Sequence, residues 1–355
     1  MIHIKNNRKN YNSADAGTNQ PSRPRYRVLG SALVLAMLIA SAISMRAQSN
    51  GLATASPQHI ALKAWYVGNE AVGFSGSPYN FNQPGGLTTD GANIYVSNGG
   101  NGNIVKLRAS DGQYLGVLAT TTDPGAMAFD GHRIWVANHN TGNPHSTVSI
   151  YDASTGAFVR SVTVGSNPDN MVWDGWGMWI PANDGTVKRI DNSGGTMCSR
   201  QVTGGPDYGV AFDGNYTWVT SINTNQVIKL DYTCTQQGTA ISVPGGPVGI
   251  VFDGTNMWTA NYYNNTVAKI TPGGVVTEFP VGAAPWQVAF DGAFIYAGNV
   301  SGKTVTKLPV NTVTGSPSYT IYPCNGASNQ SPLDLAFDGA SVWASCPSSN
   351  MIGKM

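Results

Sequence analysis

The chain has few charged residues and almost no glutamate. Only 11% of its 355 residues are Asp, Glu, Lys or Arg, and its two glutamates are Glu70 and Glu278. Disordered chains are usually rich in charge and poor in aromatic residues, whereas this chain has 9 Trp, 15 Tyr and 10 Phe. The composition therefore excludes disorder as the state of most of the chain. Its 43 Gly and 20 Pro favour short strands joined by tight turns over long helices.

Basic residues are scarce outside the N-terminal segment. Residues 1–47 hold seven Lys or Arg and one Asp, and the remainder has 13 basic and 18 acidic residues, a net charge of about −5. That remainder contains no stripe of Lys and Arg, which is the electrostatic footprint of a nucleic-acid-binding surface. We expect no nucleic-acid partner.

Only one long apolar run occurs in the chain. It covers residues 28–45, carries no charge, and follows a basic stretch that ends at Arg27. This order is typical of a secretory signal peptide, with cleavage expected after Ala47. The third residue before that cleavage point is usually small, and Met45 departs from this pattern. An apolar run of this length can also span a bilayer, so an uncleaved N-terminal anchor is the alternative.

Both interpretations place the rest of the chain outside the cytoplasm. We expect residues 1–47 to be a signal peptide or N-terminal membrane anchor, 48–59 a linker, and 60–355 one folded domain. The protein is then secreted, or it lies in the periplasm or cell envelope. Its only membrane contact would be through the anchor.

One sequence unit is repeated seven times. An Asp-Gly pair recurs at intervals of 38 to 47 residues, with its Asp at Asp90, Asp130, Asp174, Asp213, Asp253, Asp291 and Asp338. Five positions after each Asp stands an aromatic residue: Tyr95, Trp135, Trp179, Trp218, Trp258, Tyr296 and Trp343. An apolar residue lies three positions before each Asp, and a Pro lies six or seven positions before it. A period of this size indicates a repeat architecture.

The fifth unit shows the strands of one repeat. Residues 247–261 form two apolar stretches around Asp253-Gly254, a strong hairpin signal. A third strand is expected at 266–270 and a fourth at 275–281. Four antiparallel strands in about 40 residues are typical of a propeller blade. Because one such sheet cannot cover its own apolar faces, the blades must stack around an axis, with the repeated aromatic residue between neighbours and the Asp holding the turn.

The two ends of the repeat region predict how the ring closes. After Trp343 only one more strand follows, at 351–355, so the seventh blade lacks its outer strand. The segment 61–67 precedes the first repeat and is expected to supply that strand. The sequence therefore predicts an all-β fold: a seven-bladed β-propeller of four-stranded antiparallel blades, closed by an N-terminal strand that completes the last blade. Closure removes exposed sheet edges, and we expect a monomer.

Four cysteines in an exported chain are expected to form disulfides. Cys324 and Cys346 both fall on the face that carries the loops between second and third strands and the connections between blades. Cys198 and Cys234 fall near the third-to-fourth turns of adjacent blades, on the opposite face. We expect these two pairs, although the sequence alone leaves other connectivities open.

The candidate binding site is the mouth of the central channel, where each innermost strand begins just after its Pro. The residues expected there are Asp169, Asn170, Asp207, Tyr208, Trp286, Gln287 and Asp334. Three carboxylates and two large aromatic rings could hold a cation, with Ca or Mg as the candidate cofactor, or a sugar or peptide. The alternative is a hydrated entrance in which water satisfies the polar groups.

Two further sets of side chains were considered as ligands. His139 and His145 lie in one extended loop and could share a metal ion, but no carboxylate is near them in the sequence. Four Asn residues follow the second strand of their blades and are expected to bond to loop backbone; they are Asn98, Asn138, Asn261 and Asn299.

The repeat resembles a known group of proteins. The pattern Pro-x-x-apolar-x-Phe-Asp-Gly-x-x-apolar-Trp, followed by Asn and Thr-Val, resembles the YVTN/NHL-type propeller repeat. Residues 268–280, Ala-Lys-Ile-Thr-Pro-Gly-Gly-Val-Val-Thr-Glu-Phe-Pro, are similar to repeats of the streptogramin lyase (virginiamycin B lyase) family. The resemblance covers residues 84–355 and implies the propeller fold.

The same resemblance implies where the catalytic residues of the family would lie in this chain. Family lyases carry Glu eight positions after the turn Asp, and they use Glu, His and magnesium to open a cyclic depsipeptide. The corresponding positions in this chain are Asn98, Asn138, Ala182, Ser221, Asn261, Asn299 and Cys346. None is Glu, so no catalytic residue is carried over.

The sequence also contains no Ser-His-Asp or Cys-His arrangement, P-loop or dinucleotide-binding motif. We therefore expect a binding or interaction module that recognises a protein, peptide or glycan through its loop-rich axial face. The alternative is a metal-dependent enzyme, a lyase or lactonase-like hydrolase related to streptogramin lyases.

Overall fold

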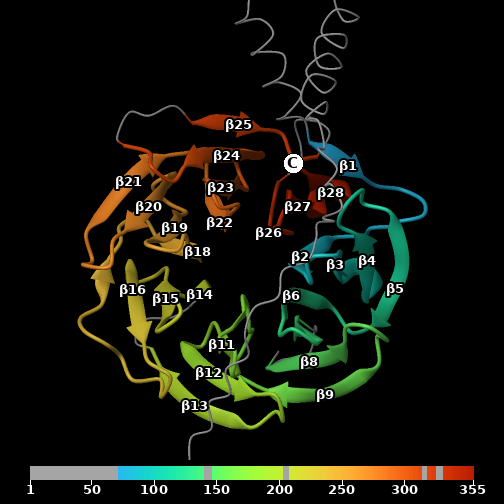
Figure 1. Ribbon diagram of the computed structural model, residues 1–355, viewed down its shortest axis with the longest axis horizontal. Helices are drawn as coiled ribbons and strands as arrows, with labels where there is room; N and C mark the ends of the chain where they lie inside the picture. Colours follow the sequence, from blue (N-terminus) through green and yellow to red (C-terminus); the bar gives the residue numbers. More distant parts are fainter. Residues whose placement is uncertain (1–70, 140–145, 203–207, 314–317, 325–330) are drawn as a thin grey trace, which may run out of the picture. The chain divides into compact units, whose positions relative to one another are not determined.

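The computed structural model describes residues 71–139, 146–202, 208–313, 318–324 and 331–355. They form seven four-stranded antiparallel sheets arranged as a ring (Figure 1). The predicted seven-bladed β-propeller is confirmed.

In blades one to six, the strands follow one another from the axis to the rim in chain order. The first four blades comprise β2 (Pro84–Thr89), β3 (Asn93–Asn98), β4 (Asn103–Arg108) and β5 (Tyr114–Thr120); β6 (Pro124–Phe129), β7 (Arg133–Asn138), β8 (Thr147–Asp152) and β9 (Phe158–Thr163); β10 (Val172–Trp173), β11 (Gly177–Pro181), β12 (Thr186–Asp191) and β13 (Thr196–Gln201); and β14 (Val210–Phe212), β15 (Thr217–Ser221), β16 (Gln226–Leu230) and β17 (Ile241–Ser242).

Blades five and six follow the same order. They comprise β18 (Pro247–Phe252), β19 (Met257–Asn261), β20 (Thr266–Ile270) and β21 (Val276–Pro280); and β22 (Pro285–Phe290), β23 (Phe294–Asn299), β24 (Thr304–Pro309) and β25 (Tyr319–Ile321). Two short 3₁₀ helices, η1 (Gly99–Asn101) and η2 (Pro347–Ser349), follow the second strands of blades one and seven.

Blade seven contains both ends of the ring. Its strands are β26 (Leu335–Phe337), β27 (Val342–Cys346), β28 (Met351–Lys354) and, outermost, β1 (Val72–Phe74), which pairs with β28. An N-terminal strand therefore completes the last blade, as predicted. The prediction that segment 61–67 supplies this strand was wrong, because Val72–Phe74 pairs with β28. Residues 61–67 lie outside the described residues. The reason is side-chain packing, because the ring of Phe74 stacks on Trp343 at 5.6 Å between centroids.

The repeated Asp and aromatic residue form one hydrogen-bonded lock in every blade. One carboxylate oxygen of the Asp accepts the backbone N–H groups two and three positions later, as Asp253 does from Thr255 and Asn256. The other oxygen accepts the indole N–H or phenol O–H of the aromatic residue, at distances of 2.6 to 2.9 Å in all seven blades. The Asp thus holds the turn, as predicted, and also orients the aromatic ring.

Each locked ring packs between two blades. Trp135, for example, lies in a core cluster with Met171 and Met178 of the following blade, and Trp258 lies in one with Val288 and Ile295. Five of the seven rings are at most 1% exposed. The predicted inter-blade position of the aromatic residue is confirmed, and burial of such large side chains stabilises the contact between neighbouring sheets.

A cation covers the aromatic ring in six of the blades. The side chain opposite the ring on the third strand is Lys106, Arg189, Lys229, Lys269, Lys307 or Lys354, and its charge lies 5.1 to 5.7 Å from the ring centroid. In blade two this position is Ile150, paired with Trp135. Lys354 also donates to the carbonyls of Ala109 and Ser110 and so ties blade seven to blade one.

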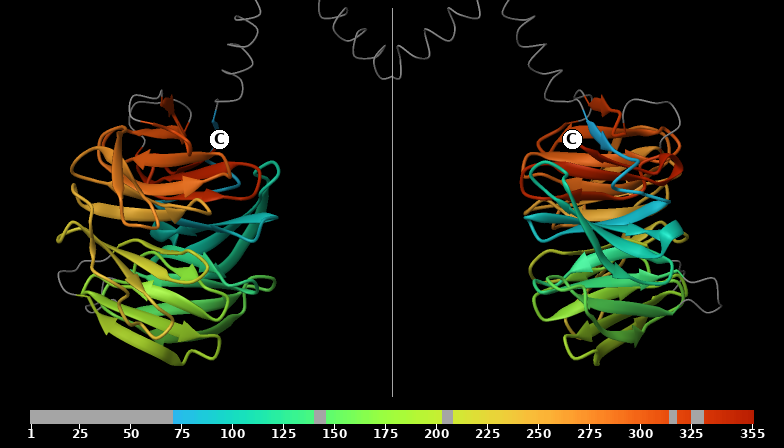
Figure 2. Two further views of the ribbon diagram at one scale, coloured as in Figure 1. Left: turned by 60° about the vertical axis from the view of Figure 1, so that its left-hand side comes forward. Right: turned by 90° about the vertical axis from the view of Figure 1, so that its right-hand side faces the viewer.

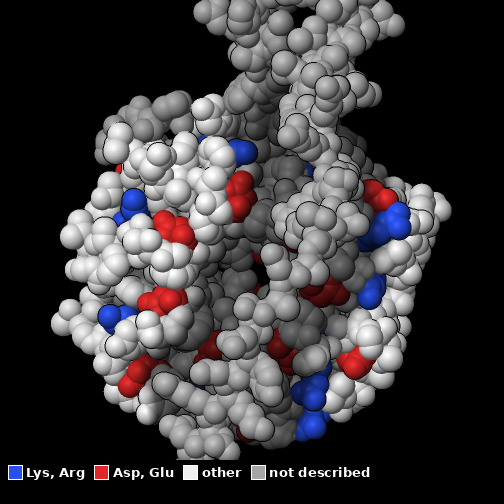
Figure 3. Space-filling model, viewed as in Figure 1, with Lys and Arg blue, Asp and Glu red and all other residues white. Residues whose placement is uncertain are grey.

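The loops lie at two ends of the twisted blades (Figure 2). We call the end with the Asp-Gly turns and the third-to-fourth turns the turn face. The mouth face carries the second-to-third loops and the connections between blades. In the view of Figure 3, acidic side chains are spaced around the ring and basic ones lie among them, mostly towards the rim.

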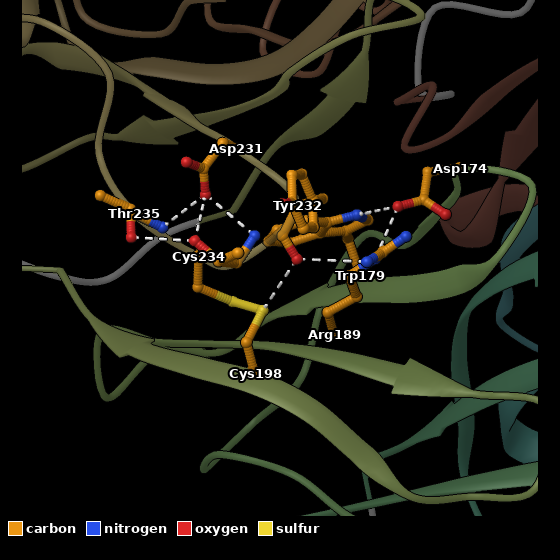
Figure 4. Close-up of a disulfide and its surroundings, with 9 residues drawn as sticks. Asp174, Trp179, Arg189, Cys198, Asp231, Tyr232, Cys234 and Thr235 are labelled. Carbon is orange, nitrogen blue, oxygen red and sulfur yellow. Dashed lines mark hydrogen bonds and ion pairs between the residues drawn. A yellow bond between two sulfur atoms is a disulfide. The ribbon is translucent and has the colours of Figure 1, made fainter.

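Two disulfides join neighbouring parts of the ring. Cys198 bonds to Cys234 and Cys324 to Cys346, with Cα atoms 5.8 and 6.7 Å apart. Both predicted pairs are confirmed. Cys198 lies on β13 and Cys234 in the turn after β16, so the first bridge fastens blade three to blade four (Figure 4).

A buried ion pair lies beside the first disulfide. Arg189 contacts Asp174 at 2.7 Å and donates to the carbonyl of Tyr232, in the turn that carries Cys234. Both side chains of the pair are almost completely buried. The pair and the disulfide therefore hold the same junction between blades.

Candidate functional site

A bulge in the innermost strand aims side chains into the channel. In blades one, two, five and six the strand pairing shifts just after the starting Pro, as between Pro84 and Leu87. In blade three Pro168 forms an isolated bridge, and regular pairing resumes only at Val172. A bulge leaves its extra residues outside the ladder and redirects their side chains. The residues after the starting Pro of these five blades therefore face the axis.

The mouth face contains a cavity of about 550 Å³ at the axis. Five of the predicted site residues line it: Asp169, Asn170, Trp286, Gln287 and Asp334. Tyr208 lies beside the cavity, where its ring packs against Trp286. Asp207 lies outside the described residues. The structure thus brings together six of the seven residues that the sequence predicted.

The inner strands approach one another closely around this cavity. A Cβ atom on Gly86 would lie 2.5 Å from the carbonyl oxygen of Gly125 in the next blade. Any side chain at position 86 would clash with the neighbouring backbone, so glycine is required there. Because the inner strands lie so close together, the polar side chains that face the axis lie close to one another.

One hydrogen bond crosses the axis between blades three and six, and others join neighbouring blades. Gln287 of blade six donates from Nε2 to Asn170 Oδ1 of blade three at 2.9 Å and to Asp334 Oδ1 of blade seven at 3.3 Å. Asn170 donates in turn to the carbonyl of Tyr208 in blade four. Buried polar groups that satisfy one another in this way rigidify their surroundings, so the centre of the cavity is held in one arrangement.

Asp334 is bonded from several sides. Its carboxylate accepts the N–H groups of Leu87 at 2.7 Å and Leu335 at 2.8 Å. Burial raises the pKa of Asp334 to about 6, against these hydrogen bonds, and the nearby charge of Asp169 adds to the rise. At neutral pH the group is mainly ionised, but it gains a proton under mild acidity.

Among the described residues, the Asp169 carboxylate has fewer hydrogen-bond partners than that of Asp334. Burial raises its pKa above the usual range, and the neighbouring imidazole of His139 opposes that rise. Asp169 therefore offers the cavity a carboxylate with free capacity to accept hydrogen bonds.

His139 also lines the cavity, which the sequence did not predict. Its Nε2 lies 3.2 Å from the carbonyl oxygen of Pro168, which can only accept, so that nitrogen carries the proton of this contact. Its ring lies against Gly125, where a Cβ atom would be 2.3 Å away. The predicted partner His145 lies outside the described residues, so the proposed two-histidine site is not tested.

Aromatic rings form one side of the mouth. The ring of Trp286 contacts Tyr208 at 5.2 Å and Tyr262 at 5.7 Å between centroids, both edge-to-face. Tyr262 comes from the loop after β19, and the sequence analysis did not single it out. The cavity therefore combines the ring of Trp286, which Tyr208 and Tyr262 support from beside the cavity, with carboxylate and amide groups.

The Asn residues at the ends of the second strands are not among the residues that line the cavity. Asn98, Asn138, Asn261 and Asn299 are all buried, and most of their bonds go to side chains rather than to the loop backbone that we expected. Asn299, for instance, donates to the hydroxyls of Thr304 and Thr306. Asn98 does bond to backbone, by accepting the N–H of Asn82. Ala182, Ser221 and Cys346 are buried too, so every position where the lyases carry their Glu is interior here.

Other cavity residues were missed although the repeat could have located them. Gln83 and Asp123 directly precede the starting Pro of blades one and two, and both line the cavity. The position directly before the Pro recurs in every unit, so comparing it across the seven repeats is the signal that locates such residues.

The described residues do not assemble a convincing metal site. No group of three or more His, Cys, Asp or Glu close enough to hold a metal ion occurs within the part of the chain that the structure covers. Divalent cations such as Ca and Mg usually need several oxygen ligands. The described side chains therefore fit such an ion poorly.

Comparisons by sequence give no match: no family model fits the chain, and no curated protein sequence is similar to it. The YVTN/NHL name of the repeat thus stays a prediction.

None of the helices in the described part of the chain has the length and apolar character of a membrane-spanning helix.

Comparisons by structure do find similar proteins. Virginiamycin B lyase from Staphylococcus aureus matches with a TM-score of 0.67 and 17% identity, over 80% of this chain and 98% of the lyase. A streptogramin B lyase structure matches with a TM-score of 0.66 and 16% identity, over 80% and 96%. Hydrazine synthase from Kuenenia stuttgartiensis matches with a TM-score of 0.64 and 16% identity, over 78% and 96%.

At these identities the likeness establishes the fold and no more. The predicted resemblance to streptogramin lyases is confirmed at that level. The neighbours named above include a lyase and a hydrazine synthase, so similar rings occur in proteins with differently named activities. This chain has the seven-bladed propeller fold seen in virginiamycin B lyase.

Proposed function

We propose that this protein is an exported binding module that recognises a ligand or partner through the cavity at its mouth face. The observation that carries the proposal is the cavity itself, where the ring of Trp286 meets hydrogen-bonded amide and carboxylate groups. Ligand pockets usually combine a concave, largely apolar surface with a few fixed polar groups. Two disulfides and the apolar run at 28–45 support export.

The test is a binding screen with one variant inside the cavity and one outside it. The purified exported chain is exposed to neutral oligosaccharides, peptides and divalent cations, and the shift of its thermal midpoint is recorded. Trp286→Ala is expected to abolish the shift given by the ligand. Trp176→Ala, which removes a 78% exposed indole from the turn face, is expected to leave it unchanged.

Two results would contradict the proposal. One is a wild-type protein that binds none of the three ligand classes. The other is a ligand whose effect survives Trp286→Ala. Binding that is lost only with Trp286→Ala supports the mouth as the site.

A second candidate is a lyase or lactonase-like hydrolase that uses Ca or Mg at the mouth. The fold likeness to virginiamycin B lyase favours it, and such an ion would need oxygen ligands besides the Asp169 and Asp334 carboxylates in the cavity. Metal analysis distinguishes the two functions: a stoichiometric ion that disappears in Asp169→Ala supports the enzyme. Absence of metal, with no opening of lactone or depsipeptide substrates, excludes it.

A further inference from the structure

A row of four aromatic rings leads from the outer loops into the cavity. Tyr263 contacts Tyr262 at 5.2 Å between centroids, Tyr262 contacts Trp286, and Trp286 contacts Tyr208. We call these four residues the aromatic row. Tyr263 is 64% exposed, whereas the other three are half-buried. The row thus begins in solvent and ends at the cavity.

Hydrogen bonds hold the backbone at the outer end of the row, although the Tyr263 ring is exposed. The backbone N–H groups of Tyr262 and Tyr263 donate to the carbonyls of Gly246 and Gly245. Gly246 has a φ of 70°, and a Cβ atom there would lie 2.5 Å from the ring of Tyr263. The ring of Tyr263 therefore lies directly against the backbone of Gly246, where a side chain would not fit. An exposed aromatic side chain with this support is prepared to bind a ligand at little entropic cost.

The steep angles within the row restrict what can bind along it. Successive rings are inclined by 61° to 88°, so they do not form one flat floor. A ligand must meet ring faces and edges in turn, and the tyrosine hydroxyls add polar groups between them. A chain of sugar rings suits this surface because it carries apolar C–H patches together with hydroxyl groups.

The inner end of the row favours a ligand rich in hydrogen-bond donors and without negative charge. The described residues that line the cavity include the carboxylates Asp123, Asp169 and Asp334 and no Lys or Arg. An anionic ligand would be repelled. A proline-rich peptide also binds aromatic grooves, but proline lacks an N–H and would leave these acceptors unsatisfied.

We infer that the aromatic row and the cavity together bind a neutral oligosaccharide, with its end in the cavity and its following sugar units along Trp286, Tyr262 and Tyr263. This inference rests on the proposed function, since it names the ligand class of the same site. It extends that site by the loop after β19, which lies outside the cavity lining.

The experiment measures affinity against chain length by calorimetry. The probes are linear oligomers of glucose, xylose and N-acetylglucosamine with one to six units, tested on the purified exported chain. The affinity for at least one series is expected to rise about tenfold from two to four units, as one further aromatic contact is made. Tyr263→Ala should remove that rise and leave binding of the disaccharide within about twofold.

Two control variants complete the test. Tyr232→Ala removes a tyrosine of similar exposure, 71%, from the turn face and should change nothing. Tyr263→Phe keeps the ring and should retain most of the rise with length. A full effect of Tyr232→Ala would show that the loss is not specific to the row and would overturn the inference.

The remaining outcomes separate this inference from the proposed function. If a proline-rich peptide or a cation binds in a Trp286-dependent manner and no oligosaccharide does, the glycan inference fails and the binding function survives. If oligosaccharides bind equally well at every length, the row plays no part and the inference also fails. If no probe of any class binds, both fail.

Discussion

The lock between Asp253 and Trp258 is expected to make a large contribution to stability, and one isosteric substitution tests it. Asp253 accepts the N–H groups of Thr255 and Asn256 on one oxygen and the indole N–H of Trp258, at 2.6 Å, on the other. In Asp253→Asn a single oxygen can keep the turn, but the new NH₂ group then faces the indole N–H. Two donors meet, and the buried indole loses its acceptor.

The size of the effect follows from the bond that is lost. A hydrogen bond to a charged group contributes about 1.5–3 kcal/mol, and an unpaired buried donor adds to the cost, so the free energy of unfolding should fall by about 2–4 kcal/mol. At about 2 °C per kcal/mol for a domain of this size, the thermal midpoint should fall by about 4–8 °C. Circular dichroism during heating measures it.

Two comparisons decide whether the indole is the cause. Asp152→Asn alters a comparable turn, where Asp152 accepts the N–H groups of Ser154 and Thr155 but has no aromatic donor. Its midpoint should fall clearly less. In a Trp258→Phe background the donor is already gone, so Asp253→Asn should lose less than half of its effect. Equal losses from Asp253→Asn and Asp152→Asn, or full additivity with Trp258→Phe, would refute the reasoning.

Two further predictions concern ring closure and the mouth. Phe74→Ala removes a ring that is 9% exposed and stacked on Trp343, and should lower the free energy of unfolding by about 3–5 kcal/mol in urea titration. Val72→Ala, at a 57% exposed position of the same strand, should change it little, and equal effects would disprove closure by Phe74. The pKa of Asp334, raised to about 6, means that the folded state binds the proton of this carboxyl group more tightly than the unfolded state does. The stability that this proton contributes is therefore fully present below about pH 4 and is lost as the pH rises through 6. Thermal midpoints at pH 4.5 and 7.5 should therefore show wild type losing stability relative to Asp334→Asn at the higher pH, and a difference that does not vary with pH would contradict the shift.

The repeat predicted most of the fold because each of its positions has one structural task. The Asp at position 253 and the Trp at 258 recur together since the lock needs both, and their spacing alone located the turn, the second strand and the inter-blade core. The closing strand was harder to place, because several N-terminal segments have an apolar pattern. Only the fit of Phe74 against Trp343 selects Val72–Phe74.

The site was predicted where position in the repeat determines position in space. Asp169, Asn170, Trp286 and Gln287 follow the starting Pro, and the bulge there turns them towards the axis. His139 and Tyr262 come from loops after the second strand, and no periodic signal shows how far such a loop reaches over the mouth. The bond between Gln287 and Asn170 joins residues 117 positions apart, and sequence spacing does not reveal such a contact.

The pairing of β1 with β28 has a consequence for how the protein is made. Val72–Phe74 is synthesised before every other described strand, whereas the described strand that pairs with it, Met351–Lys354, is synthesised after all of them. Until then Phe74 has no Trp343 to cover it, and blade seven does not exist. A nascent or prematurely terminated chain therefore displays an unpaired strand edge, which chaperones and proteases can use to tell unfinished molecules from complete ones.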